Sequence, residues 1–454
     1  MVSSLPSFIL LLITILHLAI EIPSSSASDN ILSHDSKTNI RVPVHHRDAG
    51  KGYTKYELLY RAVQRGKHRL KRFTSLATTP FTGVSPSYSA GGENVCNISM
   101  GTPGQNKVWI VDTGSDLCWT QCKPCTNCFT QVTALYDPSK SSTYRNVKFS
   151  DQFCKDLPSS SSDSNNNCIY SYGYGDQSTT QGNLSTETLT FMKTLGNSAS
   201  LVDMVIGCGT NNQGTFSGTD GLIGLGQGPL SLVSQLQQGN KKMAYCIVTF
   251  SSSDVSHIYI GSPPLNKFPN NSQSTPIQKN DAYPTYYYVL IQGISVNGEP
   301  LSYPQSSFML NKDGSGGTII DSGTTLTYLP ALVIAPMKAK IYLLVKLIPS
   351  LLPSASGLST CWYYTGGPYP NVTMTYHFAG GANMTIPNSN IFIQDLSLFF
   401  GLPLICLVTE PSTSVGSSLT SLSIFGNIHQ QNYAFKYDLD NKMITFAPQK
   451  CSVW

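Results

Sequence analysis

The sequence carries little charge for its length. Only 12% of its 454 residues are Asp, Glu, Lys or Arg, about half of the ~25% that is usual in globular proteins. This scarcity argues against long helices held together by ion pairs. Residues 81–454 contain a single arginine, Arg145, and 18 Lys and Arg against 20 Asp and Glu. A chain without a broad basic face is not expected to bind nucleic acid.

Long hydrophobic runs are also absent. Phe8–Ile20 is an apolar run of thirteen residues, shorter than the ~20 residues that span a bilayer. Small residues follow it as far as Ala27, as at a signal-peptidase site, so we predict a signal peptide over residues 1–27; a membrane anchor is the alternative. No later stretch resembles a membrane span, so no stable membrane insertion is expected. Without a coiled-coil pattern, we expect a monomer.

Residues 28–80 differ in charge from the rest of the chain. Residues 29–80 hold 11 Lys and Arg against 4 Asp and Glu, a balance of +7. Apolar residues recur at helical spacing between Tyr53 and Phe73, which predicts a basic amphipathic helix. We interpret residues 28–80 as a removable propeptide that binds the rest of its own chain. A solvated helix or a disordered arm is the alternative.

The remainder reads as mostly β structure. Gly (37) and Pro (27) are abundant, and short β-branched and aromatic runs alternate with turn residues. Helical patterns are few, at 230–239 and 330–349. Strands are predicted within 107–114, 187–192, 257–261, 285–298, 316–323, 371–378, 390–395, 433–438 and 442–448.

An internal duplication predicts two lobes. The segment WIVDTGSDLCW around Asp112 is similar to TIIDSGTTLTYL around Asp321. Each is followed by an apolar–apolar–Gly signal, at 222–224 and 424–426. Two units built on one plan, each offering one carboxylate, are therefore expected. The linker-like stretch 262–284 divides them, giving an N-terminal lobe over 81–265 and a C-terminal lobe over 266–454.

The two Asp turns suggest acid–base chemistry. An Asp that ends an apolar strand is costly to bury unless it is hydrogen-bonded. The glycine of each turn allows close backbone approach, and the hydroxyls can donate to the carboxylate. Two carboxylates brought together share one proton, so one serves as general base and the other as general acid. A pair of ordinary Asx-type turns is the structural alternative.

The cysteines and sequons fit an oxidising route. The spacing Cys118-x3-Cys122-x2-Cys125-x2-Cys128 could hold zinc, but no His lies nearby, and a disulfide-stapled insertion is the preferred interpretation. No metal or other cofactor is expected. The disulfide candidates are Cys96, Cys118, Cys122, Cys125, Cys128, Cys154, Cys168, Cys208, Cys246, Cys361, Cys406 and Cys451, and the glycosylation candidates are Asn97, Asn183, Asn270, Asn371 and Asn383.

Several of these motifs together resemble a known family. The two Asp turns, the two apolar–apolar–Gly signals and YGYGD at 172–176 resemble the pepsin-like aspartic proteases. The segment CWTQCKPCTNC at 118–128 is similar to the plant nepenthesin-type branch, and the likeness covers roughly 93–451. It implies a bilobal acid-protease fold, with an active-site cleft between two similar β lobes.

The resemblance also implies roles for single residues. Asp112 and Asp321 would be the catalytic pair, and Tyr174 and Gly175 would belong to a β-hairpin flap over the substrate, with Trp119 supporting Tyr174. Taken alone, an aromatic beside glycine in a hairpin is as often structural. The residues expected to support the pair are Thr113, Gly114, Ser115, Ser322, Gly323 and Thr324.

Some positions depart from the family pattern. Gln177 stands where the flap sequence usually has glycine. The family also usually has a cysteine at the position of Phe149 and another near Asp163, so one expected bridge is missing. Cys96 and Cys118 stand where apolar residues are usual. They either form a new bridge or stay free.

Two functions follow from the resemblance. The first is a secreted aspartic endopeptidase that acts at acidic pH on proteins or peptides, is inhibited by pepstatin-type compounds, and resides in the apoplast or alternatively the vacuole. The second is a catalytically silent pepsin-like binding or inhibitor protein. Such relatives typically lose a catalytic Asp or its turn. Both turns are intact here, so the enzyme is favoured.

Overall fold

The structure is a computed structural model. It describes residues 31–32, 40–75, 94–174, 178–192, 198–214, 216, 218–249, 252, 254–263, 265–351, 353–354, 356–364, 366–399, 402–412 and 422–454. The signal-peptide prediction for 1–27 lies outside these residues. Among the helices described, none is long and apolar enough to cross a bilayer.

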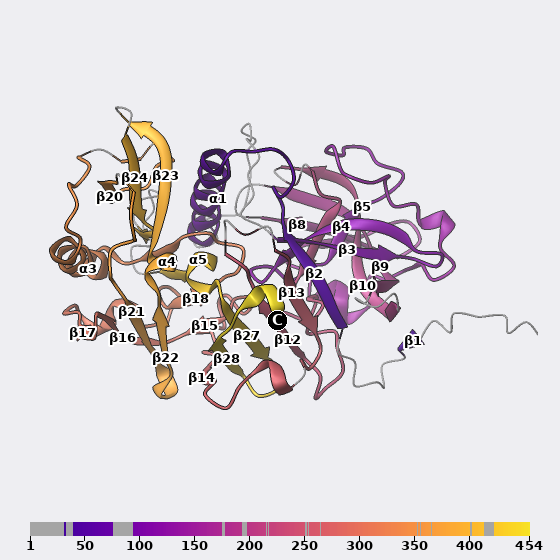
Figure 1. The fold of residues 1–454 in the computed structure, drawn as a ribbon. Coiled ribbons are helices and arrows are strands. Elements are labelled where there is room, and N and C mark those ends of the chain that lie inside the picture. The colour runs from indigo at the N-terminus through magenta and orange to yellow at the C-terminus, as the bar shows by residue number, and fades with distance from the viewer. Residues whose placement is uncertain are drawn as a thin grey trace, which may run out of the picture.

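The molecule consists mainly of β strands, as predicted. A 16-stranded sheet follows the order β14-β28-β27-β12-β13-β2-β3-β4-β11-β5-β10-β9-β8-β7, with β1 and β6 paired beside this path. Sheets of five, four and three strands complete the β structure. Figure 1 shows the first half of the chain at one end of the molecule and α3 with the smaller sheets at the other. The prediction of a bilobal, mostly β, pepsin-like fold is confirmed.

The N-terminal half is an antiparallel array around two parallel strand pairs. Strand β4 pairs with β3 on one side and, in parallel, with β11 on the other, while β9 and β10 form a long hairpin. The strands of this half are β3 (Asn94–Met100), β4 (Gln105–Asp112), β5 (Trp119–Gln121), β6 (Arg145–Asn146), β7 (Ser160–Ser162), β8 (Cys168–Gly173), β9 (Thr179–Met192), β10 (Ser198–Gln213) and β11 (Gly221–Gly224). The short helix α2 spans Gln152–Lys155.

The C-terminal half repeats the parallel pairing on a smaller scale. Strand β18 pairs in parallel with β26, and β19 runs antiparallel to β26. The five-stranded sheet contains β15 (Tyr288–Val289), β18 (Thr318–Ile320), β19 (Thr327–Leu329), β25 (Thr409–Pro411) and β26 (Ser423–Phe425). The four-stranded and three-stranded sheets contain β16 (Ile291–Val296), β17 (Glu299–Pro300), β21 (Met374–Phe378), β22 (Asn383–Ile386), and β20 (Cys361–Tyr363), β23 (Phe392–Phe399) and β24 (Leu402–Leu407). The helices are α3 (Ala331–Leu344), α4 (Asn388–Ile391) and α5 (Asn427–Gln430).

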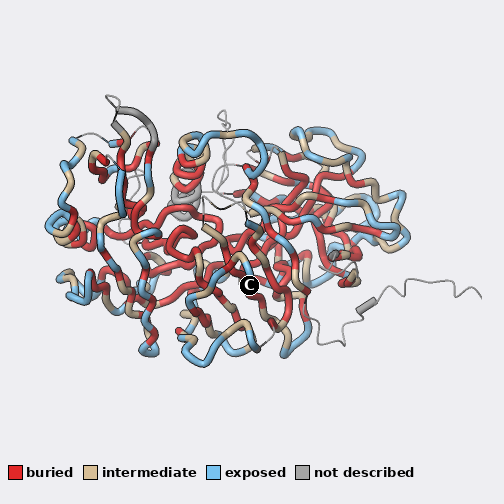
Figure 2. Tube along the Cα trace, in the orientation of Figure 1, coloured by how far each residue is buried: buried red, intermediate tan, exposed pale blue. Residues whose placement is uncertain are grey.

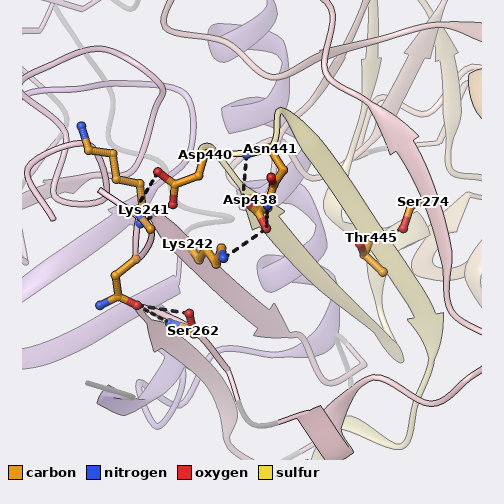
Figure 3. A network of polar contacts seen from close by, with 10 residues as sticks. Lys241, Lys242, Ser262, Ser274, Asp438, Asp440, Asn441 and Thr445 are labelled. Carbon is orange, nitrogen blue, oxygen red and sulfur yellow. Dashed lines mark hydrogen bonds and ion pairs between the residues drawn. The ribbon is translucent and has the colours of Figure 1, made fainter. Parts of the chain in front are cut away.

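Strands from both halves meet in one part of the large sheet. The strand β12 (Lys242–Cys246) pairs with β13 (Ser256–Ile260) and with β27 (Tyr433–Asp438), and β28 (Met443–Pro448) lies between β27 and β14 (Gln273–Pro276). Figure 3 shows polar contacts at this junction: Lys242 Nζ lies 3.4 Å from Asp438, and Asp440 accepts the backbone N–H of Lys241. These contacts fix the last strands of the chain to the end of its first half.

The predicted propeptide is folded against the rest of the chain. The strand β2 (Ile40–His46) lies between β13 and β3, and β1 (Ile31–Leu32) pairs with β10. The helix α1 (Lys55–Ser75) confirms the predicted amphipathic helix. Leu59 and Val63 on this helix are buried against Tyr286, Leu326 and other residues of the C-terminal half. Figure 2 shows buried residues recurring along the coloured part of α1.

The helix predicted at 330–349 is present as α3, whereas the one predicted at 230–239 is wrong. The chain forms turns there, and the Gln235 side chain hydrogen-bonds both backbone groups of Val205 on β10. Leu232, Val233 and Leu236 are buried, so their helix-like spacing reflects packing of a turn onto β10. The stretch 262–284, predicted as a linker, contains β14.

Candidate active site

Each of the two predicted catalytic aspartates lies at the end of a strand in a parallel pair. Asp112 is the last residue of β4, opposite Gly224 of β11. Asp321 directly follows β18, whose last residue Ile320 is opposite Phe425 of β26. Both carboxyl side chains are fully buried. The duplication in the sequence therefore corresponds to two similar strand arrangements, each ending in an aspartate.

The two carboxyl groups are held by matching contacts. The backbone N–H of Gly114 donates to Asp112 Oδ1 over 2.9 Å, and the Ser115 hydroxyl donates to Oδ2. In the second turn the N–H of Gly323 donates to Asp321 Oδ1 over 2.9 Å, and the Thr324 hydroxyl donates to Oδ2 over 2.6 Å. Each turn thus presents its carboxylate with one backbone and one hydroxyl donor.

A hydroxyl group connects the two turns. Thr113 Oγ1 accepts the backbone N–H of Ser322 over 3.1 Å and donates to Asp321 Oδ1 over 3.3 Å. It also lies 3.1 Å from Ser322 Oγ. Asn427 Nδ2 donates to the Ser322 carbonyl from α5. The structure therefore brings together all six residues predicted to support the pair.

The apolar–apolar–Gly signals mark places where backbone segments cross closely. A Cβ built on Gly224 would lie 2.1 Å from the Asp116 carbonyl oxygen, and one on Gly426 would lie 2.1 Å from that of Leu326. Real Cβ atoms do not approach backbone oxygen this closely. Glycine is needed at both positions because the turn that carries each aspartate passes directly over the neighbouring strand.

Tyr174 and Trp119 are in contact, as the resemblance implies. Tyr174 follows β8 and its N–H donates to Ser178 O, which closes the β8–β9 hairpin. The indole Nε1–H of Trp119 donates to the Tyr174 hydroxyl over 2.7 Å. Phe216 packs on both rings, with centroids 4.9 Å from Trp119 and 5.2 Å from Tyr174. Gly175 and Gln177 lie outside the described residues.

Asp116 is a site residue that the sequence analysis missed. Its Oδ1 accepts the N–H of Gly228 over 2.9 Å, and its Oδ2 accepts the hydroxyl of Thr285 over 2.6 Å. Thr285 belongs to the second half of the chain, so this buried carboxylate joins the first Asp turn to the other lobe. The only signal in the sequence was its place directly after D-T-G-S.

Part of the predicted propeptide approaches the second Asp turn. A Cβ at Gly66 would lie 3.9 Å from the Thr325 backbone nitrogen, next to Thr324. The preceding residue, Arg65, is buried, and its Nη1 lies 2.7 Å from Asp48 Oδ2. Burial by itself would raise the pKa of Asp48, but the Arg65 guanidinium lowers that pKa below its ordinary value. An ion pair within the segment thus lies close to the candidate site.

Ten of the twelve cysteines are paired. The bonds are Cys122–Cys208, Cys125–Cys128, Cys154–Cys168, Cys246–Cys451 and Cys361–Cys406. Cys96 and Cys118 are free and buried, so their selection as disulfide candidates is corrected. Both lie in the hydrophobic core, and burial raises the pKa of each thiol to about 12, which keeps them protonated. The spacing of Cys118, Cys122, Cys125 and Cys128 reflects two bridges and one core thiol, and the residues described hold no cluster of metal-ligating side chains.

The candidate glycosylation sites differ in exposure. Asn97 lies in β3 but is exposed, as are Asn270, Asn371 and Asn383. Asn183 is only partly exposed, within β9 and paired to both β8 and β10.

Comparisons with known proteins show what the chain is similar to. A family described as "Xylanase inhibitor N-terminal" matches residues 95–262, and one described as "Xylanase inhibitor C-terminal" matches residues 286–448. The aspartic proteinase nepenthesin-2 of Nepenthes gracilis is 40% identical over 442 residues, 95% of this chain and 96% of that protein. Nepenthesin-1 of the same species is 41% identical over 460 residues, 99% of each chain. The crystal structure of edgp shares the fold, with a TM-score of 0.67 at 17% identity, covering 92% of this chain and 96% of that one.

Proposed function

The chain belongs to the plant nepenthesin-type branch of the pepsin-like aspartic proteases and is an aspartic-type endopeptidase; from this premise we propose that Asp112 and Asp321 are its catalytic carboxylates. The observation that carries the proposal is the matched geometry of the two turns. Each buried carboxylate accepts one glycine N–H and one hydroxyl from its own turn, and Thr113 connects the two turns.

The proposed reaction is direct hydrolysis of a peptide bond. The pair holds one proton between its two carboxyl groups, because two adjacent negative charges repel each other. The ionised member takes a proton from water as the oxygen attacks the carbonyl carbon, while the protonated member donates its proton to the carbonyl oxygen. The resulting diol breaks at the C–N bond as the amine nitrogen gains a proton. The pair must keep that one proton, so activity is confined to acidic pH.

Tyr174 is proposed to act above the bound peptide rather than in proton transfer. Its position beside the β8–β9 hairpin tip and its bond to Trp119 support a flap that covers an extended substrate and excludes water. The substrates are proteins or peptides, and pepstatin-type compounds are expected to compete for the same cleft.

We also propose how the chain is secreted and activated. Residues 1–27 direct secretion to the apoplast or, alternatively, the vacuole, and residues 28–80 form a propeptide that is removed in acid. Support for the propeptide comes from its positive charge and from α1, which packs beside the second Asp turn. The mature lobes, 81–265 and 266–454, act as a monomer.

The test is a cleavage assay on the purified precursor and its Asp112→Asn variant. At a pH of about 4, wild type should degrade a denatured protein substrate and should be blocked by pepstatin. Asp112→Asn should be inactive, while Asp281→Asn, which alters an exposed carboxylate, should match wild type. Activity in Asp112→Asn would reject the assignment.

The family descriptions name an inhibitor, which keeps a binding function as the second candidate. If wild type, freed of residues 28–80, leaves every substrate intact, the binding function replaces the catalytic one. Xylanase inhibition by the same preparation would then support it directly.

A further inference from the structure

Exposed apolar side chains gather at one end of the C-terminal half. Among the described residues, ten large hydrophobic side chains are exposed, and half of them fall within the twenty residues 332–351. Leu343, Ile348 and Leu351 are 79%, 73% and 95% exposed. Contiguous exposed apolar surface of this kind usually marks an interaction site. We call these residues the α3 patch: Leu332, Tyr342, Leu343, Ile348 and Leu351.

Helix α3 has apolar residues on both of its faces. One stripe, which includes Val333, Met337 and Ile341, is buried in the core. The opposite stripe is exposed and contains only uncharged residues at helical spacing: Leu332, Ala335, Ala339, Tyr342 and Leu343. A surface helix ordinarily directs polar residues to solvent. Packing within the lobe explains the first stripe, whereas the residues of the second stripe remain exposed.

The chain after α3 brings more apolar side chains to the same place. The Tyr342 ring lies 5.1 Å from the Trp362 ring of β20, and Pro349 forms a β-bridge with Trp362. The Ile348 carbonyl accepts the N–H of Tyr363. The end of α3 and the segment 348–351 are thus both anchored to one strand. Figure 1 shows α3 at the outer end of the molecule, well separated from β2.

The stretch of chain that carries the patch contains basic residues and no acidic ones. No Asp or Glu occurs between Asp321 and Asp395, a stretch that contains Lys338, Lys340 and Lys346. Lys346 is exposed, and Lys338 Nζ donates to Ser359 Oγ at the surface. Lys340 pairs with Glu299 of β17, and Lys338 lies close enough to the buried Glu410 of β25 for its charge to lower the pKa of that carboxyl. Because Lys338 and Lys340 each have a carboxyl group nearby, the net positive charge at the rim of the patch is carried by the exposed Lys346.

We propose that the α3 patch docks the protein onto an anionic lipid surface. Leu and Ile side chains beside Lys are the combination by which peripheral proteins enter the boundary between lipid headgroups and acyl chains. Lysines near an anionic surface each strengthen such binding by about fivefold at moderate salt. This is association with a membrane surface, not a membrane span. It goes beyond the proteolytic function and does not depend on it.

Protein partners fit the patch less well. Lys is depleted from protein–protein interfaces, and Leu is under-represented among residues that dominate binding energy, whereas Arg, Tyr and Trp are favoured. The α3 patch has one Tyr, with no Arg. A second copy of the chain would bring two sets of lysines together across a symmetric interface, which is unfavourable.

The test is vesicle flotation of the purified chain. Vesicles of phosphatidylcholine alone are compared with vesicles that contain about 30% phosphatidylserine, at low and high salt. Wild type should float with the anionic vesicles, and added salt should weaken this binding. Leu343→Ser/Ile348→Ser/Leu351→Ser should reduce binding at least about tenfold, and Lys346→Gln about fivefold. The matched control Val132→Ser/Phe149→Ser/Val453→Ser, which alters exposed apolar residues elsewhere, should bind as wild type.

Three outcomes would overturn the proposal. In the first, wild type does not float with the anionic vesicles. In the second, the Leu343/Ile348/Leu351 variant floats as well as wild type. In the third, the control variant loses as much binding as the Leu343/Ile348/Leu351 variant. Sedimentation of the same samples addresses the second-copy alternative. A wild-type dimer that becomes monomeric in the patch variant, with no vesicle binding, would assign the patch to self-association. Folding of each variant is checked by its thermal midpoint.

Discussion

At the scale of single residues, the Trp119–Tyr174 hydrogen bond offers a direct test of the flap. Trp119→Phe removes the indole donor, 2.7 Å from the Tyr174 hydroxyl, and keeps an aromatic ring in the pocket. The Tyr174 hydroxyl then loses this hydrogen bond, and the ring is held less firmly over the substrate. We expect kcat/KM to fall about fivefold, which corresponds to the ~1 kcal/mol contributed by one buried hydrogen bond.

A second tryptophan provides the matched control. Trp109 is equally buried, and its Nε1–H donates to the Ile98 carbonyl over 3.0 Å, within the β3–β4 pair. Trp109→Phe loses the same kind of bond but should lower only the thermal midpoint. Equal losses of kcat/KM in the two variants would contradict a specific role for Trp119.

Residue contacts within a motif were predictable from the sequence, whereas contacts between lobes were not. Ser115 and Thr324 stand three residues after their aspartates, so the turn itself brings each hydroxyl to its carboxylate. The bonds from Thr113 to Ser322 and from Asp116 to Thr285 join residues more than 160 positions apart. Their geometry depends on how the two lobes pack, which no local pattern encodes.

At the scale of elements, the crossing of the first Asp turn over β11 gives a sharp stability prediction. In Gly224→Ala the new methyl group would overlap the Asp116 carbonyl, and backbone atoms cannot move aside as a flexible side chain can. We expect a loss of about 3 kcal/mol or more in the free energy of unfolding. Gly173→Ala in β8 is the control, because the added Cβ would meet nothing within 4 Å. Urea denaturation measures both, and similar midpoints would contradict the crossing.

Two segments differ from the secondary structure predicted for them, β2 and residues 230–239, and in each the sequence contains patterns that favour different structures. Ile40, Val42 and Val44 alternate with polar residues or Pro in β2 and are buried. That period of two is typical of a strand. Only a helix was predicted in 28–80, because the interpretation rested on the positive charge of this segment. At 230–239 the spacing of buried leucines predicted a helix, and a side-chain bond from Gln235 to β10 fixes turns instead.

At the scale of the whole molecule, the segment 40–75 is part of both the central sheet and the C-terminal core. Strand β2 completes the sheet between β13 and β3, and α1 buries Leu59 and Val63. Its removal would expose two sheet edges and an apolar surface. Release of residues 40–75 therefore costs free energy. Protonation of titratable groups in the segment can offset this cost, and their pKa values determine the pH range in which it does so.

Two such groups act in different pH ranges. Burial, with the nearby Arg65 charge, lowers the pKa of His46 from 6.5 to about 4. The released segment binds a proton on His46 below pH 6.5, while the docked segment does not until about pH 4. Docking therefore weakens as the pH falls through this range. The lowered pKa of Asp48 has its effect below its ordinary value of 3.8, where protonation breaks the ion pair with Arg65.

In the His46→Asn variant, we therefore expect docking of the segment 40–75 to depend little on pH between pH 6.5 and about 4. The side chain that takes up the proton on release is absent from this variant. Asp48→Asn removes the partner of Arg65 at every pH, so the segment should be released at a higher pH than in wild type. Both variants are made in an Asp112→Asn background, where cleavage does not obscure docking. Hydrogen exchange of residues 40–75, corrected for intrinsic rates, measures docking. Identical pH profiles for wild type and His46→Asn would show that another group controls release.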